Sequence, residues 1–268
     1  MKNILKHVLL ILLIAEPFNA KSQATDSLAA IKAFYKVVSF SQSPTLFYKA
    51  VTELRSIPVL EQEDTATYRS EFIRQPGDLY IFNAGEELFL KEGYLVNINP
   101  KEKRIAISKW KDGKEPFKFL PPDSARIREM LRNNYSISMS LKEKNISLIT
   151  FEKTGGGELS SVQTKIELLF DRNNWLPIEF SITRSVKQET DKAGIEELKG
   201  LGIATDSVVK QIGNKWYLVR EQRIRTRFTE ISVSGKKKMP ELSDRLAMKD
   251  GHFTTTAAYN DFEVINDY

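Results

Sequence analysis

Few side chains in this sequence have the chemistry of catalytic residues. Of the two histidines, His7 lies in an N-terminal segment that we expect to be removed, so only His252 would remain. That residue alone would have to serve a serine–histidine–aspartate triad or a histidine-based zinc site. A single histidine in the glycine-containing turn KDGHFT is more typical of a solvated position. We therefore predict neither a catalytic histidine nor a metal site.

The motifs of other enzyme classes are missing as well. The sequence has no cysteine, which excludes a thiol nucleophile, a thiolate metal site and a disulfide. It contains no HExxH, Walker or GxSxG motif. The glycine-rich run TGGGELSS at 154–161 follows a strand pattern without opening a helix, which favours a hairpin loop over a phosphate-binding loop. A glycosidase needs only two carboxylates, but no pair is singled out among the 35 acidic residues. We predict a non-enzymatic protein without a cofactor.

Three arginines alternate along the segment REQRIRTRF. On a strand, Arg223, Arg225 and Arg227 would share one face. Such a row is usual on the solvated face of an antiparallel strand, where the arginine stems lie along their neighbours. The functional alternative is a contact with an anion or a lipid head group, and these three arginines are the candidates for it.

The first 24 residues have the layout of a secretory signal peptide. Two lysines precede an unbroken apolar run from Val8 to Ala15, and Glu16-Pro17 interrupts this run. A transmembrane helix would need about 20 apolar residues. The segment ends in Ser22-Gln23-Ala24, with small residues at the positions that signal peptidases read. We predict cleavage after Ala24, in preference to Ala20, and a periplasmic or secreted protein. Without a cysteine, the mature protein cannot carry a bacterial lipoprotein anchor.

The charge of the chain points to no large anionic partner. Forty lysines and arginines stand against 35 aspartates and glutamates, and the two signs are interspersed along the chain. A nucleic-acid-binding protein gathers its positive charge in one patch or stripe. We therefore expect no nucleic-acid partner, and we expect no transmembrane span in the mature protein.

Period-two alternation of apolar and polar residues dominates the sequence after the signal and predicts strands with one dry face. In Glu86–Ser108, for example, Leu88 and Leu90 alternate in one segment, and Ile105 and Ile107 in another. The predicted strands are 46–57, 65–75, 78–83, 87–91, 93–99, 104–110, 135–142, 165–171, 177–184, 215–233 and 253–265.

Two segments have the period of an amphipathic helix. Asp26–Gln42 can be capped by Asp26 or Ser27, and Asp123–Asn134 follows a Pro121-Pro122 break. We expect the apolar stripe of the first helix to face the sheet. This stripe comprises Leu28, Ile31, Phe34, Tyr35 and Val38.

Short connections between these strands predict an antiparallel sheet, and a dozen twisted strands rarely stay flat. We predict a mainly β fold, a single strongly curled, half-open antiparallel barrel of about 11–12 strands. The N-terminal helix and the short mid-chain helix would cover its concave face. Residues 25–268 should form one domain, with an irregular insertion near 187–213 where no period is sustained.

The span from Thr67 to Ser108 resembles the N-terminal half of the periplasmic lipoprotein carriers, the LolA-like family. In that family a helix precedes strands with a proline-containing turn, and a hairpin of the type dGk.l.iydp..k.v follows. The sequence EGYLVNINP at Glu92–Pro100 is similar to this hairpin. In Ile166–Ile182, IELLFDRNNWLPIEFSI looks like the family's strand–fd..g.lp–strand hairpin.

The resemblance implies an unclosed barrel whose apolar concavity, covered by helices, takes up acyl chains or a lipidated protein. We therefore expect an exported, monomeric cell-envelope protein that binds a lipid or acyl chain, or a lipoprotein. Because alternate strand positions face inward, the candidates for the cavity lining are Phe34, Phe72, Leu79, Ile81, Leu88, Leu90, Ile166, Leu168, Phe180 and Ile182.

The sequence also departs from the family pattern. The family carriers have an arginine in the strand after the proline turn that holds the helical lid, whereas this chain has Asp78-Leu79-Tyr80-Ile81 there. The alternative function is therefore an envelope protein-interaction module of the same fold, with its concavity filled by side chains. A carboxylate-based hydrolase is the least favoured of the three.

Overall fold

The structure is a computed structural model, and it describes residues 27–110, 135–153, 162–235, 237–249 and 252–267. The chain divides into two compact units, one made of residues 1–38 and 121–223 and the other of residues 39–120 and 224–268. That residues 25–268 form one domain stays a prediction. The predicted signal peptide, the mid-chain helix at 123–134 and the loop at 154–161 lie outside the described residues.

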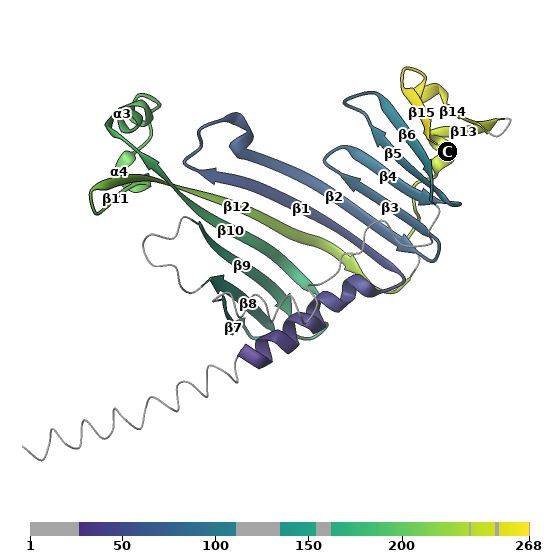
Figure 1. Ribbon diagram of the computed structural model, residues 1–268. Coiled ribbons are helices and arrows are strands. Elements are labelled where there is room, and N and C mark those ends of the chain that lie inside the picture. Colours follow the sequence, from purple (N-terminus) through teal and green to yellow (C-terminus); the bar gives the residue numbers. More distant parts are fainter. Residues whose placement is uncertain (1–26, 111–134, 154–161, 236, 250–251, 268) are drawn as a thin grey trace, which may run out of the picture. The chain divides into compact units, whose positions relative to one another are not determined.

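The first unit is a sheet with a helix on one face (Figure 1). Its strands follow the order β7-β8-β9-β10-β12, and β11 pairs with β12 as well. The pairs β7–β8, β8–β9, β9–β10 and β11–β12 are antiparallel. The strands are β7 (Tyr135–Glu143), β8 (Ile146–Lys153), β9 (Val162–Asp171), β10 (Pro177–Thr190), β11 (Val209–Ile212) and the first half of β12 (Lys215–Ser232).

The segment 187–213, which the sequence predicts to be irregular, contains ordered elements. β10 continues to Thr190, and α3 (Lys192–Gly200), α4 (Thr205–Val208) and β11 follow. The carboxylate of Asp191 caps α3 by accepting a hydrogen bond from the Gly194 amide at 2.9 Å, as aspartates do at helix N-termini. Because these elements are short, none sustains a period that is visible in the sequence.

The second unit has a sheet in the order β15-β6-β5-β4-β3-β2-β1-β12 and a separate hairpin of β13 and β14. Three short 3₁₀ helices, η1 (Ser39–Gln42), η2 (Gln62–Asp64) and η3 (Leu242–Asp244), and a fourth, η4 (Ala257–Tyr259), connect its strands. The strands are β1 (Leu46–Ile57), β2 (Thr65–Gln75), β3 (Asp78–Asn83), β4 (Glu86–Lys91), β5 (Tyr94–Asn99), β6 (Arg104–Lys109), the second half of β12, β13 (Leu246–Lys249), β14 (His252–Thr255) and β15 (Glu263–Asp267).

The prediction of a mainly β fold with an unclosed antiparallel sheet is confirmed. Two details differ from it. Thirteen strands of the described residues belong to one hydrogen-bonded sheet, more than predicted, and β15 runs parallel to β6. A parallel pair needs a long connection, and the chain between β6 and β15 supplies one. The strand predicted at 253–265 is in fact β14 and β15, separated by η4.

Tight turns fix the register of β2, β3 and β4. The two-residue loops Ala84-Gly85 and Glu92-Gly93 have positive φ at both positions, 53° and 94° in the first and 54° and 80° in the second. This is the geometry of a type I′ turn, whose twist matches that of antiparallel strands. Pro76-Gly77 closes the β2–β3 hairpin with a different turn, because the ring of Pro76 fixes a negative φ and only Gly77 has a positive φ, of 86°. Side chains on these strands are therefore aligned in cross-strand rows.

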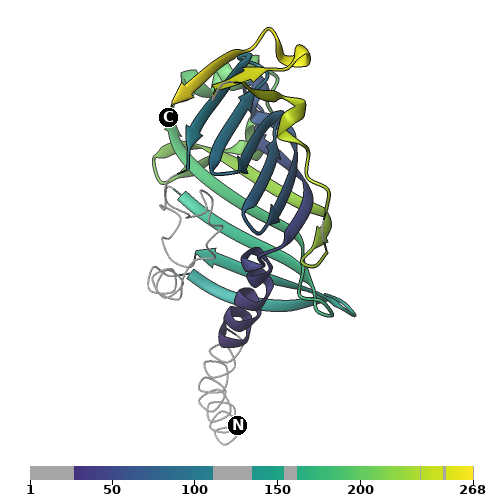
Figure 2. The same cartoon turned by 90° about the vertical axis from the view of Figure 1, so that its right-hand side faces the viewer.

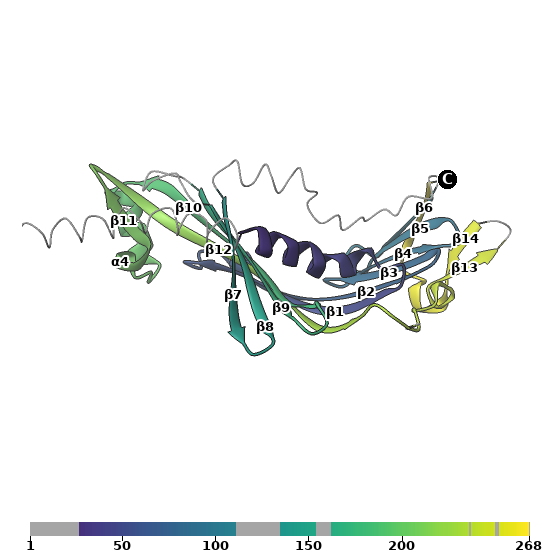
Figure 3. The ribbon, with the colours of Figure 1, turned by 90° about the horizontal axis from the view of Figure 1, so that it is seen from below.

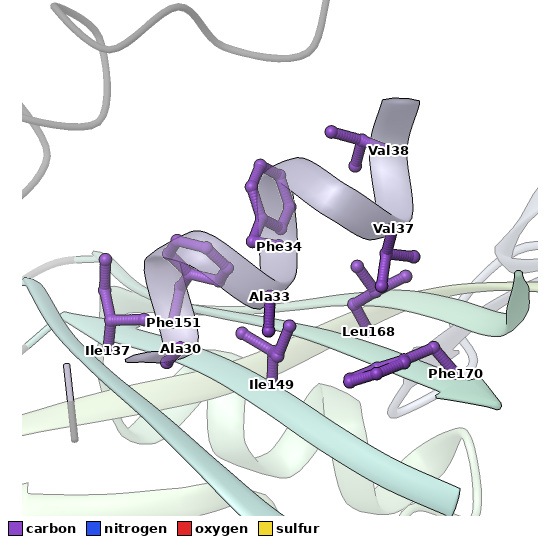
Figure 4. Packing of buried hydrophobic residues seen from close by; sticks show 10 residues of the cluster. All are labelled: Ala30, Ala33, Phe34, Val37, Val38, Ile137, Ile149, Phe151, Leu168 and Phe170. Carbon is purple, nitrogen blue, oxygen red and sulfur yellow. The ribbon is translucent and has the colours of Figure 1, made fainter. Parts of the chain in front are cut away.

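The helix at 27–38 packs on β7, β8 and β9, as Figures 3 and 4 show. Its buried side chains meet Ile137, Ile149, Phe151, Leu168 and Phe170. The predicted stripe is partly wrong, because Leu28 is 54% exposed. Small side chains let the helix approach the sheet closely, so the buried stripe is rotated. It comprises Ala30, Ala33, Phe34, Val37 and Val38.

Strands β3 to β6 bury one face under the C-terminal elements, which are yellow in Figure 2. Leu246 of β13 and Phe253 of β14 pack there against Phe89 and Ile107. The apolar side chains that alternate in Glu86–Ser108 therefore do not all lie on the same face of the sheet. Phe89, not Leu88 or Leu90, shares the face of Ile105 and Ile107, because β4 carries large apolar side chains on both faces.

Candidate functional site

Five of the predicted cavity residues lie on one face of β2, β3 and β4 in the second unit. Two cross-strand rows hold them. Phe72 pairs with Ile81 and Ile81 with Leu88, while Leu79 pairs with Leu90. Phe72, Leu79 and Leu90 are buried, and Ile81 and Leu88 are half-buried. We call these five residues the β2–β4 face.

Side chains from several elements of the same unit pack against the buried part of this face. They are Phe40, Tyr48, Leu95, Trp110 and Ile231. Tyr48 stacks on Phe72, with ring centroids 5.1 Å apart and ring planes 3° from parallel. Most of these neighbours are aromatic or aliphatic, and the indole nitrogen of Trp110 is buried without a hydrogen-bond partner in the described chain. The surroundings of the buried part of the face are therefore apolar.

One buried cation lies at the end of the β2–β4 face. Arg74, which is 6% exposed, pairs with Leu79 across β2 and β3. Its Nη1 donates hydrogen bonds to the carbonyl oxygens of Ser41, at 2.8 Å, and Ser43, at 3.2 Å. The guanidinium also lies 5.2 Å from the ring centroid of Phe72. These contacts offset the cost of burying a charge. Burial raises the pKa of Tyr48, and the charge of Arg74 partly opposes this rise.

Arg74 is the residue of this site that the sequence reasoning missed. The family resemblance directed attention to the strand after the proline turn, and Arg74 stands in the strand before it. A possible signal was its position two residues after Phe72, which puts an arginine on an otherwise apolar strand face.

The opposite face of the same strands holds a polar cluster under the C-terminal elements. The Tyr80 hydroxyl donates to Glu87 Oε2 at 3.1 Å, and Arg245 Nη2 contacts the same oxygen at 3.0 Å. Only 10% of the Glu87 side chain and 18% of the Arg245 side chain are exposed. Burial, and next the negative charge of Glu87, strongly raise the pKa of Tyr80. This cluster fixes the C-terminal elements to the sheet and belongs to the core.

The raised pKa of Tyr80 predicts a loss of stability at alkaline pH. In the unfolded chain Tyr80 ionises near its ordinary pKa of 10.0, whereas in the folded protein it keeps its proton to higher pH. Its contribution is therefore complete below pH 10 and is lost as the pH rises above that value. Chemical denaturation at pH 8 and pH 11 should show a smaller loss for Tyr80→Phe than for the wild type. An equal loss in Tyr80→Phe and in the wild type would contradict this prediction.

Four of the other predicted cavity residues pack in the first unit. Phe34 and Leu168 are buried between the helix and the sheet (Figure 4). Ile166 and Phe180 pack against the same cluster. Ile182 is half-buried and pairs with Ile166. Side chains of the helix fill the space over β7 to β9, so these positions lie in a packed core.

The three arginines of β12 have different surroundings. Arg223, in the first unit, is exposed beside Glu167 and Glu179 on the sheet face opposite to Leu168. Arg227, in the second unit, lies 3.7 Å from Glu53. Arg225 is half-buried. That they bind a lipid head group stays a prediction.

Little in the described residues points to catalysis. His252 is exposed on β14. Across the described ranges, no group of three His, Cys, Asp or Glu side chains could hold a metal ion. Within the same ranges, no helix combines the length and the apolar character needed to cross a membrane.

Comparison with known proteins finds similarity among solved structures. No protein-family model and no curated protein match the chain. It is similar to a LolA superfamily protein from Nitrosomonas europaea, with 10% identity, 78% of this chain and 94% of that chain covered, and a TM-score of 0.27. It is also similar to a DUF1329 family protein from Desulfovibrio piger, with 9% identity, coverage of 77% and 92%, and a TM-score of 0.28. At these identities and TM-scores the likeness carries no further argument.

Proposed function

We propose that this chain is an exported, non-enzymatic protein of the cell envelope that binds a lipid or acyl chain, free or attached to a protein, on the β2–β4 face. The observation that carries the proposal is the alignment of five apolar side chains on three neighbouring strands, with the buried cation Arg74 at their end. An acyl chain needs a long apolar surface, and a carboxylate or phosphate at its end is attracted by a guanidinium.

The first experiment is native mass spectrometry of the protein purified from the cell envelope. We expect the mass of a chain that begins at Thr25, which would report cleavage after Ala24. We also expect a second species that is heavier than this chain by the mass of one lipid. A chain that keeps residues 1–24 would contradict export. Protein that carries no lipid and binds no fluorescent fatty acid would contradict the binding proposal.

Two variants locate the binding surface. Ile81→Trp and Leu88→Trp enlarge half-buried side chains on the β2–β4 face, and they should weaken binding of a fluorescent fatty acid by about tenfold, because each fills space that the acyl chain would use. Phe82→Trp is the matched control, since Phe82 is also half-buried on β3 but packs on the opposite face. Equal weakening in all three variants would place the acyl chain elsewhere.

One observation favours the alternative function, a protein-interaction module of the same fold. In the first unit the helix side chains fill the space over the sheet, and Ala30, Val37, Ile149 and Phe170 are fully buried. If the second unit is filled in the same way, lipid would be absent and Ile81→Trp would destabilise the fold by about 1–3 kcal/mol through overpacking. Thermal denaturation of the tryptophan variants therefore separates the two functions.

A further inference from the structure

Trp110 carries a hydrogen-bond donor that the fold does not use. Its Nε1 is buried, and the described chain offers it no acceptor. Buried polar groups are nearly always hydrogen-bonded, because a buried donor without a partner loses its hydration for nothing in return. The residue as a whole is half-buried and packs on the cluster formed by Leu46, Phe72, Leu79 and Leu90. A ligand on the β2–β4 face can supply the missing acceptor.

The register of the second unit puts Trp110 and Arg74 at the same end of its strands. One cross-strand row comprises Arg74, Leu79, Leu90, Leu95 and Ser108. Trp110 follows Ser108 by two positions and so belongs to the same face. Its amide donates to the Gly93 carbonyl at 2.8 Å, which extends the pairing of β5 with β6. In the opposite direction along the strands, the next row of the face contains Phe72, Ile81 and Leu88. The face thus has a polar end, with a cation and a neutral N–H donor, and an apolar end.

The two polar groups favour different acceptors. The guanidinium of Arg74 attracts an anion, such as a carboxylate or a phosphate. The indole N–H of Trp110 is uncharged and lies among apolar side chains, where an ionised acceptor would be costly to bury. An ester carbonyl is an uncharged acceptor and suits this donor better. A free fatty acid has one polar group and would satisfy only one end of this pair.

We infer that the ligand of the β2–β4 face is a glycerophospholipid. Its phosphate lies toward Arg74, and the carbonyl of an acyl ester accepts a hydrogen bond from Trp110 Nε1. Glycerol joins these two groups in the lipid, so both stay at the polar end of the face while the acyl chain extends toward Ile81 and Leu88. This assignment rests on the acyl-chain binding proposed above, and it adds the class of lipid.

Two lysophospholipids that differ by one carbonyl group provide the test. They share the phosphate head group and the chain length, but one carries its chain as an acyl ester and the other as an alkyl ether. Each is titrated into the mature protein below its critical micelle concentration, and displacement of the fluorescent fatty acid reports its binding. We expect the wild type to bind the ester about fivefold more tightly than the ether, which corresponds to one hydrogen bond.

Trp110→Phe removes the N–H donor and keeps an aromatic ring at the same position. The preference for the ester over the ether should disappear in this variant. Trp216→Phe is the matched control, since Trp216 lies on β12 in the first unit and is 36% exposed, and it should keep the preference of the wild type. If Trp110→Phe does not fold, infrared spectroscopy of the ester bound to the wild type decides, because a hydrogen-bonded carbonyl absorbs at a lower frequency than a free one.

The possible results separate the class of lipid from acyl-chain binding itself. Three results would overturn the phospholipid assignment and leave acyl-chain binding intact. These are equal affinity of the wild type for ester and ether, an unchanged preference in Trp110→Phe, and a bound ester whose carbonyl absorbs at the frequency of a free one. Binding of the fatty acid without either lysophospholipid would do the same. A wild type that binds neither lysophospholipid nor the fatty acid would overturn both proposals.

Discussion

Replacing Phe34 with alanine is expected to lower the free energy of unfolding by about 3–5 kcal/mol, the usual cost of deleting a buried phenylalanine. Phe34 is 6% exposed and meets Phe151 edge to face, with ring centroids 5.0 Å apart at 74°. The variant removes this aromatic contact and leaves a void between the helix and the sheet. Urea denaturation followed by circular dichroism measures the effect.

Leu28→Ala is the matched control for this prediction. Both residues belong to the apolar stripe that the sequence predicts for the same helix, but Leu28 is 54% exposed. Its loss should change the stability by less than about 0.5 kcal/mol, as for most surface substitutions. A larger effect for Leu28 than for Phe34 would mean that the helix docks with its predicted stripe and not with the observed one.

Removing one partner of the buried ion pair is expected to have an effect of similar size. Glu87→Gln should cost about 3–5 kcal/mol, because it removes the buried carboxylate from Arg245 and leaves only the exposed Asp244, at 3.3 Å, as its partner. Glu102→Gln is the control. Glu102 forms a pair with Arg104 at 3.1 Å, but both side chains are about half exposed, and such pairs contribute at most about 1 kcal/mol. Denaturation of both variants at neutral pH tests the difference.

A double variant separates the charge from the packing. Glu87→Leu with Arg245→Met replaces both charges by apolar side chains, and replacing a buried pair in this way is often neutral. We expect the double variant to be more stable than Glu87→Gln. If it is less stable, the pair stabilises the protein through its hydrogen bonds, including the one from Tyr80, and not through charge compensation.

The strands of the second unit could be predicted from the sequence because their signals are local. The predicted ranges 46–57, 65–75 and 78–83 coincide with β1, β2 and β3. Alternation ends at residues that force a turn, such as Pro76-Gly77, so both the strands and their hairpin register follow from neighbours in the sequence.

What could not be predicted depends on contacts that leave no local signal. Alanines count little in an apolar stripe, so the face of the helix that holds Ala30 and Ala33 was missed. Strands with apolar side chains on both faces, such as β3, do not reveal which face is core. The strand that pairs with β15 and the carbonyl that accepts a hydrogen bond from Arg74 lie far away in the sequence. The alternation of apolar and polar residues does not predict such partners.

The order in which the two units occur along the chain has a consequence for biogenesis. Residues of the second unit flank those of the first, and the helix at 27–38 precedes its sheet by the whole of β1 to β6. Neither unit can thus be completed from one continuous stretch of chain, because the helix at 27–38 waits for β7 to β12 and the strands β1 to β6 wait for the residues after 223. Such distant pairing slows folding. The helix at 27–38 therefore finds its partner strands only after β9 has been synthesised, and it stays undocked until then.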